Sequence, residues 1–175
     1  MLGAILFFAC ALVFAKYIRV TRAEKLDMGL ADTVDVVRSA VESYATANKA
    51  AFQQGRTLMF VNDQYAPTIA ELQTLGYLAL TAGTNVANPF GSTYGVKLVV
   101  NPNQSITGLV YLNSSLLDAL GKPDQNRSCR IARALLDKGV CTSPFNAGVL
   151  QNGTTQIANP SGQPAVVAAL VFVSP

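Results

Sequence analysis

The stretch LADTVDVVRSAVESYATAN, residues 30–48, has the clearest periodicity in the chain. Its large apolar side chains recur at spacings of four, three, four and three residues, so they share one face of an α-helix. The charged residues Asp32, Asp35 and Glu42 fall elsewhere around that helix. We therefore expect an amphipathic helix that packs its apolar face on a globular head. The residues of this face are Leu30, Val34, Val37, Val41 and Tyr44.

The helical signal continues toward the N-terminus. Residues 2–15, LGAILFFACALVFA, carry no charge, and no proline occurs before Pro67. One helix that includes this run and the amphipathic stretch would be roughly 75 Å long at 1.5 Å per residue, which is too long for the rest of the chain to cover. The expected division is a helix over residues 1–52, with an apolar half (1–22) and an amphipathic half (23–52), followed by a head over 53–175.

The uncharged run has two other interpretations. It is shorter than the about 20 residues of a membrane-spanning helix, but it suits the apolar region of a signal peptide, and Val13-Phe14-Ala15 is an acceptable cleavage site. Against a signal peptide, no basic residue precedes the run. Lys16, Arg19 and Arg22 behind it would tend to hold the following chain in the cytoplasm, so an outward-facing head needs a basic leader upstream. We favour the continuous helix.

The head is expected to be α+β, with short helices packed on an antiparallel sheet. Thr68 and Glu71 have the spacing of a capping box, which predicts a helix that starts near Pro67 and ends at Gly76. Two further short helices are expected over residues 114–122 and 126–139, the second closed by Gly139.

The strands of the sheet follow from apolar runs between turn residues. Residues 94–100 and 106–112 follow a turn at 88–91 and predict a β-hairpin. Turn-forming residues dominate 142–164, where we expect no strand. The last run, AVVAALVFV at 165–173, is apolar throughout, which is typical of a strand in the middle of a sheet.

The composition excludes the commonest catalytic and metal-binding classes. The 175 residues include no histidine, and only 13% are charged, about half the usual share. Without histidine the chain has no side chain that titrates near neutrality and no imidazole ligand for a metal. It also has no phosphate-binding loop and no G-x-G-x-x-G motif after a strand. We expect neither an enzyme nor a cofactor, and a neutral surface suits packing against copies of the same chain outside the cell.

The chain has three cysteines. Cys10 lies in the apolar run, where a small buried thiol is the simplest interpretation. Cys129 and Cys141 are twelve residues apart and could form a disulfide or ligate a metal. The absence of another thiol or imidazole nearby favours the disulfide, which would contribute about 3 kcal/mol and place the head in an oxidising compartment.

Three arginines form the densest group of charge. Arg127, Arg130 and Arg133 are spaced by three residues, so they share one face of the expected helix. Such a stripe could follow the phosphates of DNA. With no aromatic residue between the arginines, a solvated helix face or a contact with acidic residues of a neighbouring subunit is the better interpretation, and we do not expect DNA to bind.

The order of these segments resembles that of type IV pilins and the pseudopilins of type II secretion. An apolar N-terminal helix continues into LADTVDVVRSAVESYATAN, followed by AELQTLGYL at 70–78 and NPFGSTYGVKLVV at 88–100. The cysteine pair looks like the disulfide that bounds the C-terminal region of pilins, here residues 129–141. Within the group the chain is most similar to the type IVb branch, including the shufflon-type minor pilins of conjugative thin pili.

The resemblance implies a pilin fold and a structural subunit of an extracellular filament. Such a subunit resides in the inner membrane before assembly, and an assembly ATPase and a platform protein drive its polymerisation. The alternatives within the group are a minor pilin that acts as a tip adhesin for a cell-surface receptor or binds DNA, and a secretion pseudopilin. The side chains expected in the filament core are Leu2, Ile5, Leu6, Phe7, Phe8, Leu12, Val13 and Phe14.

The N-terminus departs from the pilin pattern. Pilins have a short basic leader that ends in glycine and a glutamate at the fifth position of the mature chain. This chain has Ile5 and no basic leader, and its apolar run is shorter than in pilins. Two interpretations account for this: the sequence starts inside the mature protein, with the leader and the glutamate upstream of Met1, which is our expectation, or this is a mature pilin that lacks the glutamate.

Overall fold

The computed structural model describes residues 2–79, 92–153 and 155–175, with side chains from Arg22 onward. Helix α1 (Leu2–Ala47) has 46 residues and is followed by the short helix α2 (Lys49–Gln53). The sequence predicted one helix to residue 52, but it breaks at Asn48. There the carbonyl oxygen of Tyr44 accepts two hydrogen bonds from Asn48, one from its side-chain amide at 2.9 Å and one from its backbone N–H at 3.1 Å.

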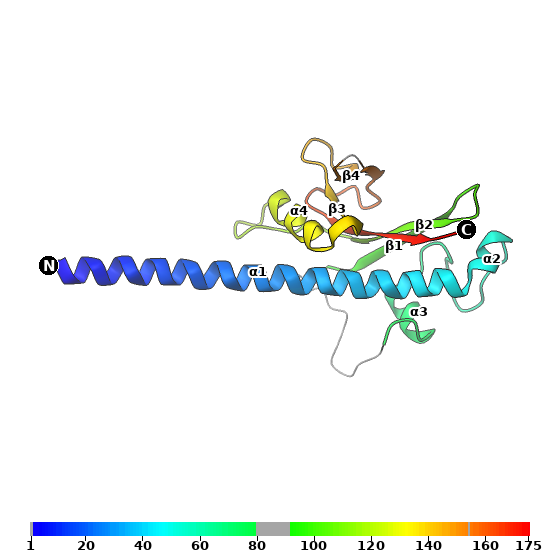
Figure 1. The fold of residues 1–175 in the computed structure, drawn as a ribbon, viewed down its shortest axis with the longest axis horizontal. Coiled ribbons are helices and arrows are strands. Elements are labelled where there is room, and N and C mark those ends of the chain that lie inside the picture. Colours follow the sequence, from blue (N-terminus) through cyan, green and yellow to red (C-terminus); the bar gives the residue numbers. More distant parts are fainter. Residues whose placement is uncertain (1, 80–91, 154) are drawn as a thin grey trace.

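The head contains one antiparallel sheet, in the strand order β1-β2-β6-β3-β4-β5. Figure 1 shows it beside the C-terminal half of α1, so the fold is mixed α+β, as the sequence predicted. The last strand, β6, lies between β2 and β3 and is central, which confirms the prediction for the apolar run. The strands are β1 (Tyr94–Val100), β2 (Ile106–Leu112), β3 (Gly139–Thr142), β4 (Val149–Asn152), β5 (Thr155–Ala158) and β6 (Val167–Val173).

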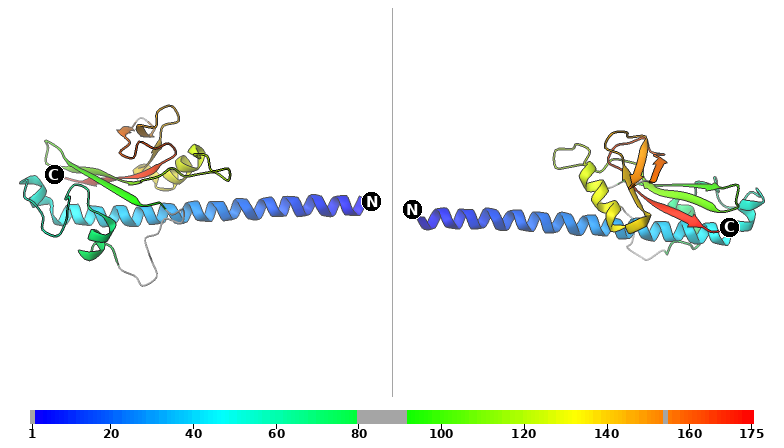
Figure 2. Two further views of the ribbon diagram at one scale, coloured as in Figure 1. Left: turned by 180° about the vertical axis from the view of Figure 1, so that it is seen from behind. Right: turned by 45° about the horizontal axis from the view of Figure 1, so that its top comes forward.

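Helix α1 packs along β2 and β6 through the face that its periodicity predicted. The five residues of that face, from Leu30 to Tyr44, are 0 to 1% exposed. Both views in Figure 2 show the C-terminal half of α1 running beside the sheet. Tyr44 ends the stripe, with its ring 5.8 Å from that of Phe52 and 5.6 Å from that of Tyr77. Burial raises the pKa of the Tyr44 phenol, whose hydroxyl lies 3.1 Å from the carbonyl oxygen of Gln64.

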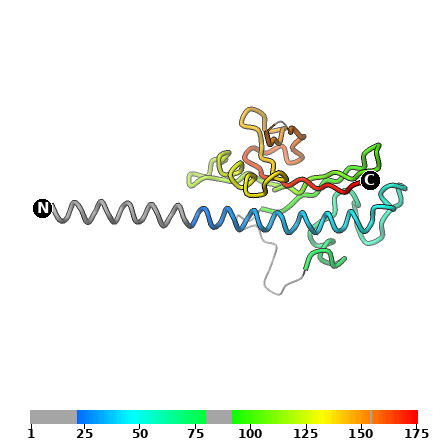
Figure 3. Tube along the Cα trace, in the orientation of Figure 1, coloured from blue at the N-terminus to red at the C-terminus, as the bar shows by residue number. Residues whose placement is uncertain are grey.

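Helix α3 (Ile69–Thr74) begins with the predicted capping box. The backbone N–H of Glu71 donates to Thr68 Oγ1 at 3.2 Å, and the backbone N–H of Thr68 donates to Glu71 Oε2 at 2.7 Å. Gly76 follows the helix with a φ of +78°, a conformation that glycine adopts without strain. The trace in Figure 3 places α3 across α1 from β4.

Two parts of the head differ from the prediction. Residues 114–122 form no helix, because Asp118 Oδ1 accepts hydrogen bonds from the backbone N–H groups of Leu120 and Lys122 and closes a turn instead. In the predicted turn region, β4 and β5 pair as a short hairpin. The turn expected at 88–91 lies outside the described residues.

Candidate functional site

Among the side chains that the structure describes, the first buried one of helix α1 belongs to a charged residue, Asp27. This residue lies three positions before Leu30 and so continues the apolar stripe by one step, yet it is a carboxylate that is only 4% exposed. A buried carboxylate is costly unless charged or hydrogen-bonding groups surround it. Two arginines of the head supply those groups, and we call Asp27, Arg127 and Arg130 the Asp27 clamp.

The arginines come from helix α4 (Gln125–Ala134). Asp124 caps its first turn by accepting a hydrogen bond from the backbone N–H of Arg127 at 2.9 Å. The opposite face of α4 is buried in the head through Ser128, Ile131 and Ala132. Because three-residue spacing keeps side chains on one face of a helix, Arg127 and Arg130 both point to α1.

The carboxylate of Asp27 uses both oxygens. Arg127 Nε donates to Oδ1 at 2.6 Å, while Arg130 donates to Oδ2 from Nη2 at 2.6 Å and from Nε at 3.1 Å. The Arg127 side chain is 14% exposed and that of Arg130 is 51% exposed. The clamp therefore has one enclosed ion pair and one that reaches solvent.

A charged contact of this kind fixes position more than it adds stability. The cost of removing the charges from water offsets most of their attraction, so a buried ion pair adds little net stability over apolar packing. Removing one partner is different, since the remaining charge is then buried without compensation. Because the guanidinium groups must meet the carboxylate in a narrow range of geometry, the clamp defines where α1 meets the head.

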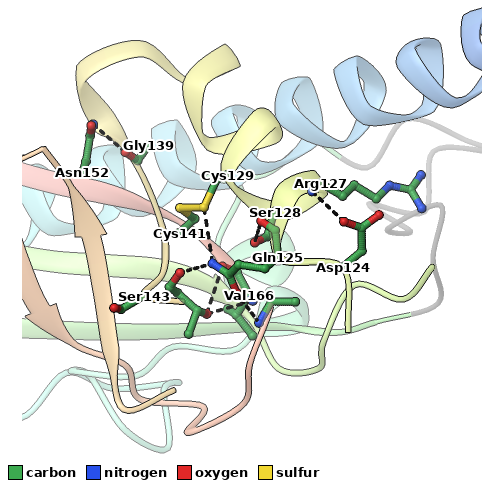
Figure 4. Close-up of a disulfide and its surroundings, with 12 residues drawn as sticks. Asp124, Gln125, Arg127, Ser128, Cys129, Gly139, Cys141, Ser143, Asn152 and Val166 are labelled. Carbon is green, nitrogen blue, oxygen red and sulfur yellow. Dashed lines mark hydrogen bonds between the residues drawn. A yellow bond between two sulfur atoms is a disulfide. The ribbon is translucent and has the colours of Figure 1, made fainter. Parts of the chain in front are cut away.

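A disulfide ties α4 to the sheet behind the clamp (Figure 4). Cys129 of α4 is bonded to Cys141 of β3, the pair named from the sequence. Beside it, the Gln125 side-chain amide donates to Cys129 Sγ at 3.3 Å and to the carbonyl oxygen of Thr142, and its oxygen accepts from the backbone N–H of Ala165 at 3.2 Å. Through these contacts the arginines of the clamp are held to β3 and to the segment just before β6.

Gly139 closes the helical segment, as the sequence predicted, but as the C-cap residue of a 3-10 turn rather than of α4 itself. Helix α4 ends at Ala134, the 3-10 turn η1 (Leu136–Lys138) follows, and Gly139 begins β3 with a φ of −83°. A Cβ at this position would lie 1.9 Å from the carbonyl oxygen of Ala132. Glycine is thus required because β3 starts directly against the end of α4.

A groove runs beside the clamp between α1 and η1. Its volume is about 360 Å³. Exposed apolar side chains flank it, with Met28 64% and Leu136 75% exposed. The residues that line it are Met28, Ala31, Asp32, Asp35, Ala134, Leu135, Leu136, Asp137 and Lys138.

The acidic wall of the groove is partly neutralised by Arg38. Arg38 Nε contacts Asp35 Oδ1 at 2.7 Å and its Nη1 contacts Glu42 Oε2 at 2.6 Å. Burial alone would lower the pKa of Arg38, but the two carboxylates raise it, so the guanidinium stays charged. Neither Asp32 nor Asp137 has an ion-pair partner among the described residues.

The predicted site residues fall into three groups. Cys129 and Cys141 are bonded, and the stripe from Leu30 to Tyr44 is buried. Of the three arginines, Arg127 and Arg130 contact Asp27, while Arg133 is exposed and lines a smaller cavity of about 180 Å³ next to the disulfide. The side chains expected in a filament core, from Leu2 to Phe14, lie outside the described residues.

Sequence reasoning missed Asp27. The signal that could have revealed it was its position, since it extends a four-and-three apolar pattern with a charged residue. A charged residue on a buried helix face needs an opposite charge or hydrogen-bond donors beside it. Its partners are 100 and 103 residues away in the chain, and no local pattern connects them.

Chemically, the site joins two helices, because the carboxylate of Asp27 on α1 pairs with arginines of α4. Within the described ranges no three His, Cys, Asp or Glu side chains gather as metal ligands would. Of the helices in the part of the chain that the structure describes, none is long and apolar enough to cross a membrane. Comparison of the chain with protein-family models, with curated proteins and with solved structures gave no match.

Proposed function

We propose that this chain is a structural subunit of an extracellular filament of the type IV pilus kind, with a pilin fold, and that it polymerises through α1. One observation carries the proposal: α1 begins at Leu2, and among the side chains that the structure describes, the first buried one of α1 is that of Asp27. The described residues between Arg22 and Leu26 are exposed or half-buried. The helix is therefore much longer than the head contact needs.

The sequence of the N-terminal part of α1, residues 2–15, indicates what this part contacts. Residues 2–15 carry no charge, and a helix that is apolar all round is stable only in lipid or against other apolar helices. Both environments occur in the life of a pilin, first the inner membrane and then the filament core. A contact between unlike surfaces of identical subunits does not close and so builds a fibre, with an assembly ATPase and a platform protein supplying the work.

The head has features that suit the outside of such a filament. A disulfide ties α4 to β3, and disulfides persist in oxidising compartments. The few charges leave a largely neutral surface that can pack against neighbouring subunits. DNA is not part of this proposal, because Arg127 and Arg130 already contact Asp27.

A second candidate is a low-copy minor pilin that binds a surface at the filament tip. Two loop side chains favour it: Phe145 is 96% exposed and Leu120 is 81% exposed. Exposed large apolar side chains on loops are typical of recognition sites. Subunit abundance separates the two candidates, since a main subunit dominates sheared filaments on a gel and a tip protein is a trace band.

Electron microscopy of the purified full-length chain, with any native upstream residues, tests the proposal. We expect filaments after detergent is removed. Phe7→Asp, which places a charge in the apolar segment, should prevent them, whereas Phe145→Ser, at an exposed loop, should not. A wild-type chain that stays a dispersed monomer without detergent contradicts the proposal.

A further inference from the structure

The groove between α1 and η1 has an acidic character. Three of its lining residues, Asp32, Asp35 and Asp137, are carboxylates, against the single ammonium group of Lys138. Although Asp35 is paired with Arg38, that arginine is also shared with Glu42, so the surrounding charge remains negative. Exposed apolar side chains border the groove, so it fits an elongated partner with basic and apolar groups.

The same helix carries the complementary charge further upstream. Lys16, Arg19, Arg22 and Lys25 are spaced by three residues, with Glu24 the only carboxylate among them. Arg22 and Lys25 are exposed, and neither has an ion-pair partner among the described residues. We call residues 16–25 the basic segment.

The basic segment cannot fill the groove of its own molecule. Both belong to one continuous helix, and Arg19 and Asp32 are 13 positions apart, which is roughly 20 Å along the axis at 1.5 Å per residue. A rigid helix cannot fold back over that distance. Two parallel copies of α1 displaced by the same roughly 20 Å would place Arg19 level with Asp32 and Arg22 level with Asp35.

We propose that the groove beside the Asp27 clamp binds the basic segment of a second copy of this chain. The inference rests on the proposed filament and names one of its subunit contacts. Complementary charges at an interface fix register and suppress wrong pairings, so the contact would set the axial displacement between neighbouring subunits. The apolar borders at Met28 and Leu136 would pack beside the basic segment.

Charge reversal tests the contact in the full-length chain. Asp32→Lys with Asp137→Lys should lower the polymerised fraction about tenfold, since attraction is replaced by repulsion, with an unchanged unfolding midpoint of the monomer. Asp32→Lys alone should already lower the polymerised fraction, and Asp63→Lys, the same single charge change at an exposed carboxylate elsewhere on the head, is its matched control and should assemble like wild type. Adding Arg19→Asp to the first variant should restore much of the assembly, because this register places Arg19 level with Asp32.

Cross-linking gives a readout that does not depend on the amount of polymer. In a Cys10→Ser background, copies with Asp32→Cys are mixed with copies with Arg19→Cys and oxidised. We expect a disulfide-linked dimer, and none when Asp63→Cys replaces Asp32→Cys. No dimer from either mixture, or equal amounts from both, overturns the inference.

The outcomes separate the contact from the function. If wild type forms filaments and the reversed variant assembles equally well, the groove contact is wrong while the proposed function stands. If wild type forms no filaments under any of these conditions, both are wrong. If the basic segment instead binds vesicles of anionic lipid and the groove variants assemble normally, its partner is a lipid surface and the inference is overturned.

Discussion

Helix α1 contacts the head in two chemically different regions. From Leu30 to Tyr44 the contact is apolar and fully buried, whereas at Asp27 it consists of one carboxylate between two arginines. The apolar region follows from a period that is visible in the sequence. The charged region depends on residues about 100 positions apart.

The difference suggests a division of roles along one helix. A large apolar side chain contributes about 1.5–3 kcal/mol when it is fully buried, so the stripe supplies most of the attachment. Apolar packing is not strongly directional, whereas hydrogen-bonded ion pairs require a defined geometry. The stripe thus holds the helix on the head, and the clamp fixes the point from which the upstream part of α1 extends.

The largest loss of stability is expected from a substitution in the apolar region. Tyr44→Ala removes a ring that contacts Phe52 and Tyr77 and should lower the free energy of unfolding by about 3–5 kcal/mol. Urea denaturation of the detergent-solubilised monomer measures it. Val36→Ala, on the same helix but 54% exposed, should change it by less than about 0.5 kcal/mol. Equal losses in both variants would show that the stripe is not the main attachment.

The second largest loss of stability is expected when the disulfide between Cys129 and Cys141 is removed. Replacing Cys129 and Cys141 together by serine should cost about 3 kcal/mol, because the crosslink no longer restricts the unfolded chain. Wild type in a reducing buffer should approach the variant, and the reductant should leave the variant itself unchanged. If reduction weakens wild type by much less than this, the link between α4 and β3 adds little to the head.

The clamp itself should have a smaller effect on stability than on geometry. Asp27→Asn removes the carboxylate charge that Arg127 and Arg130 contact and should cost about 2 kcal/mol, less than for a fully buried pair because Arg130 can turn to solvent. Asp32→Asn, five residues along the same helix and exposed, is the control and should be nearly neutral. Spin labels on α1 and on the sheet should show a broader distance distribution in Asp27→Asn. An unchanged distribution would mean that the clamp does not fix the geometry.

Much of the fold could be predicted from the sequence because its signals are local. The apolar stripe needs only a helical period, the start of α3 needs only Thr68 and Glu71, and β1 and β2 are adjacent runs joined by a short turn. The position of β6 in the centre of the sheet followed from its lack of polar residues. Each of these elements has its own pattern within a few residues.

The rest depended on contacts that local patterns do not encode. Strands β4 and β5 have four residues each, too few to show alternation among turn residues. Residues 114–122 were predicted to form a helix, but the side chain of Asp118 closes a turn there. The arginines were recognised as one face of α4, yet their partner Asp27 became evident only when α4 was placed on α1. The candidate site therefore needed the tertiary structure.

The smallest change in the free energy of unfolding is expected at Glu71, whose role in the helix cap could be predicted from the sequence. Hydrogen bonds from the backbone N–H groups of Asn62 and Thr68 hold the pKa of Glu71 below its ordinary value of 4.5. A carboxylate with a lowered pKa stabilises the fold above its unfolded pKa, and this contribution disappears as the pH falls through the folded pKa. Glu71→Gln should therefore cost about 1 kcal/mol at neutral pH, and the difference from wild type should shrink on acidification to about pH 3.

Unfolding curves at several pH values measure this difference directly. Asp63, an exposed neighbour whose carboxylate accepts a hydrogen bond from the backbone N–H of Tyr65, gives the control variant Asp63→Asn. This variant removes one negative charge away from the capping box, so an equal loss of stability in both variants would indicate a general effect of charge. If the free energies of unfolding of Glu71→Gln and wild type differ by the same amount at neutral and acidic pH, the negative charge of Glu71 does not contribute to the cap. Unlike the Asp27 clamp, this group is stabilised by backbone donors close in sequence, and so it could be identified before the fold was known.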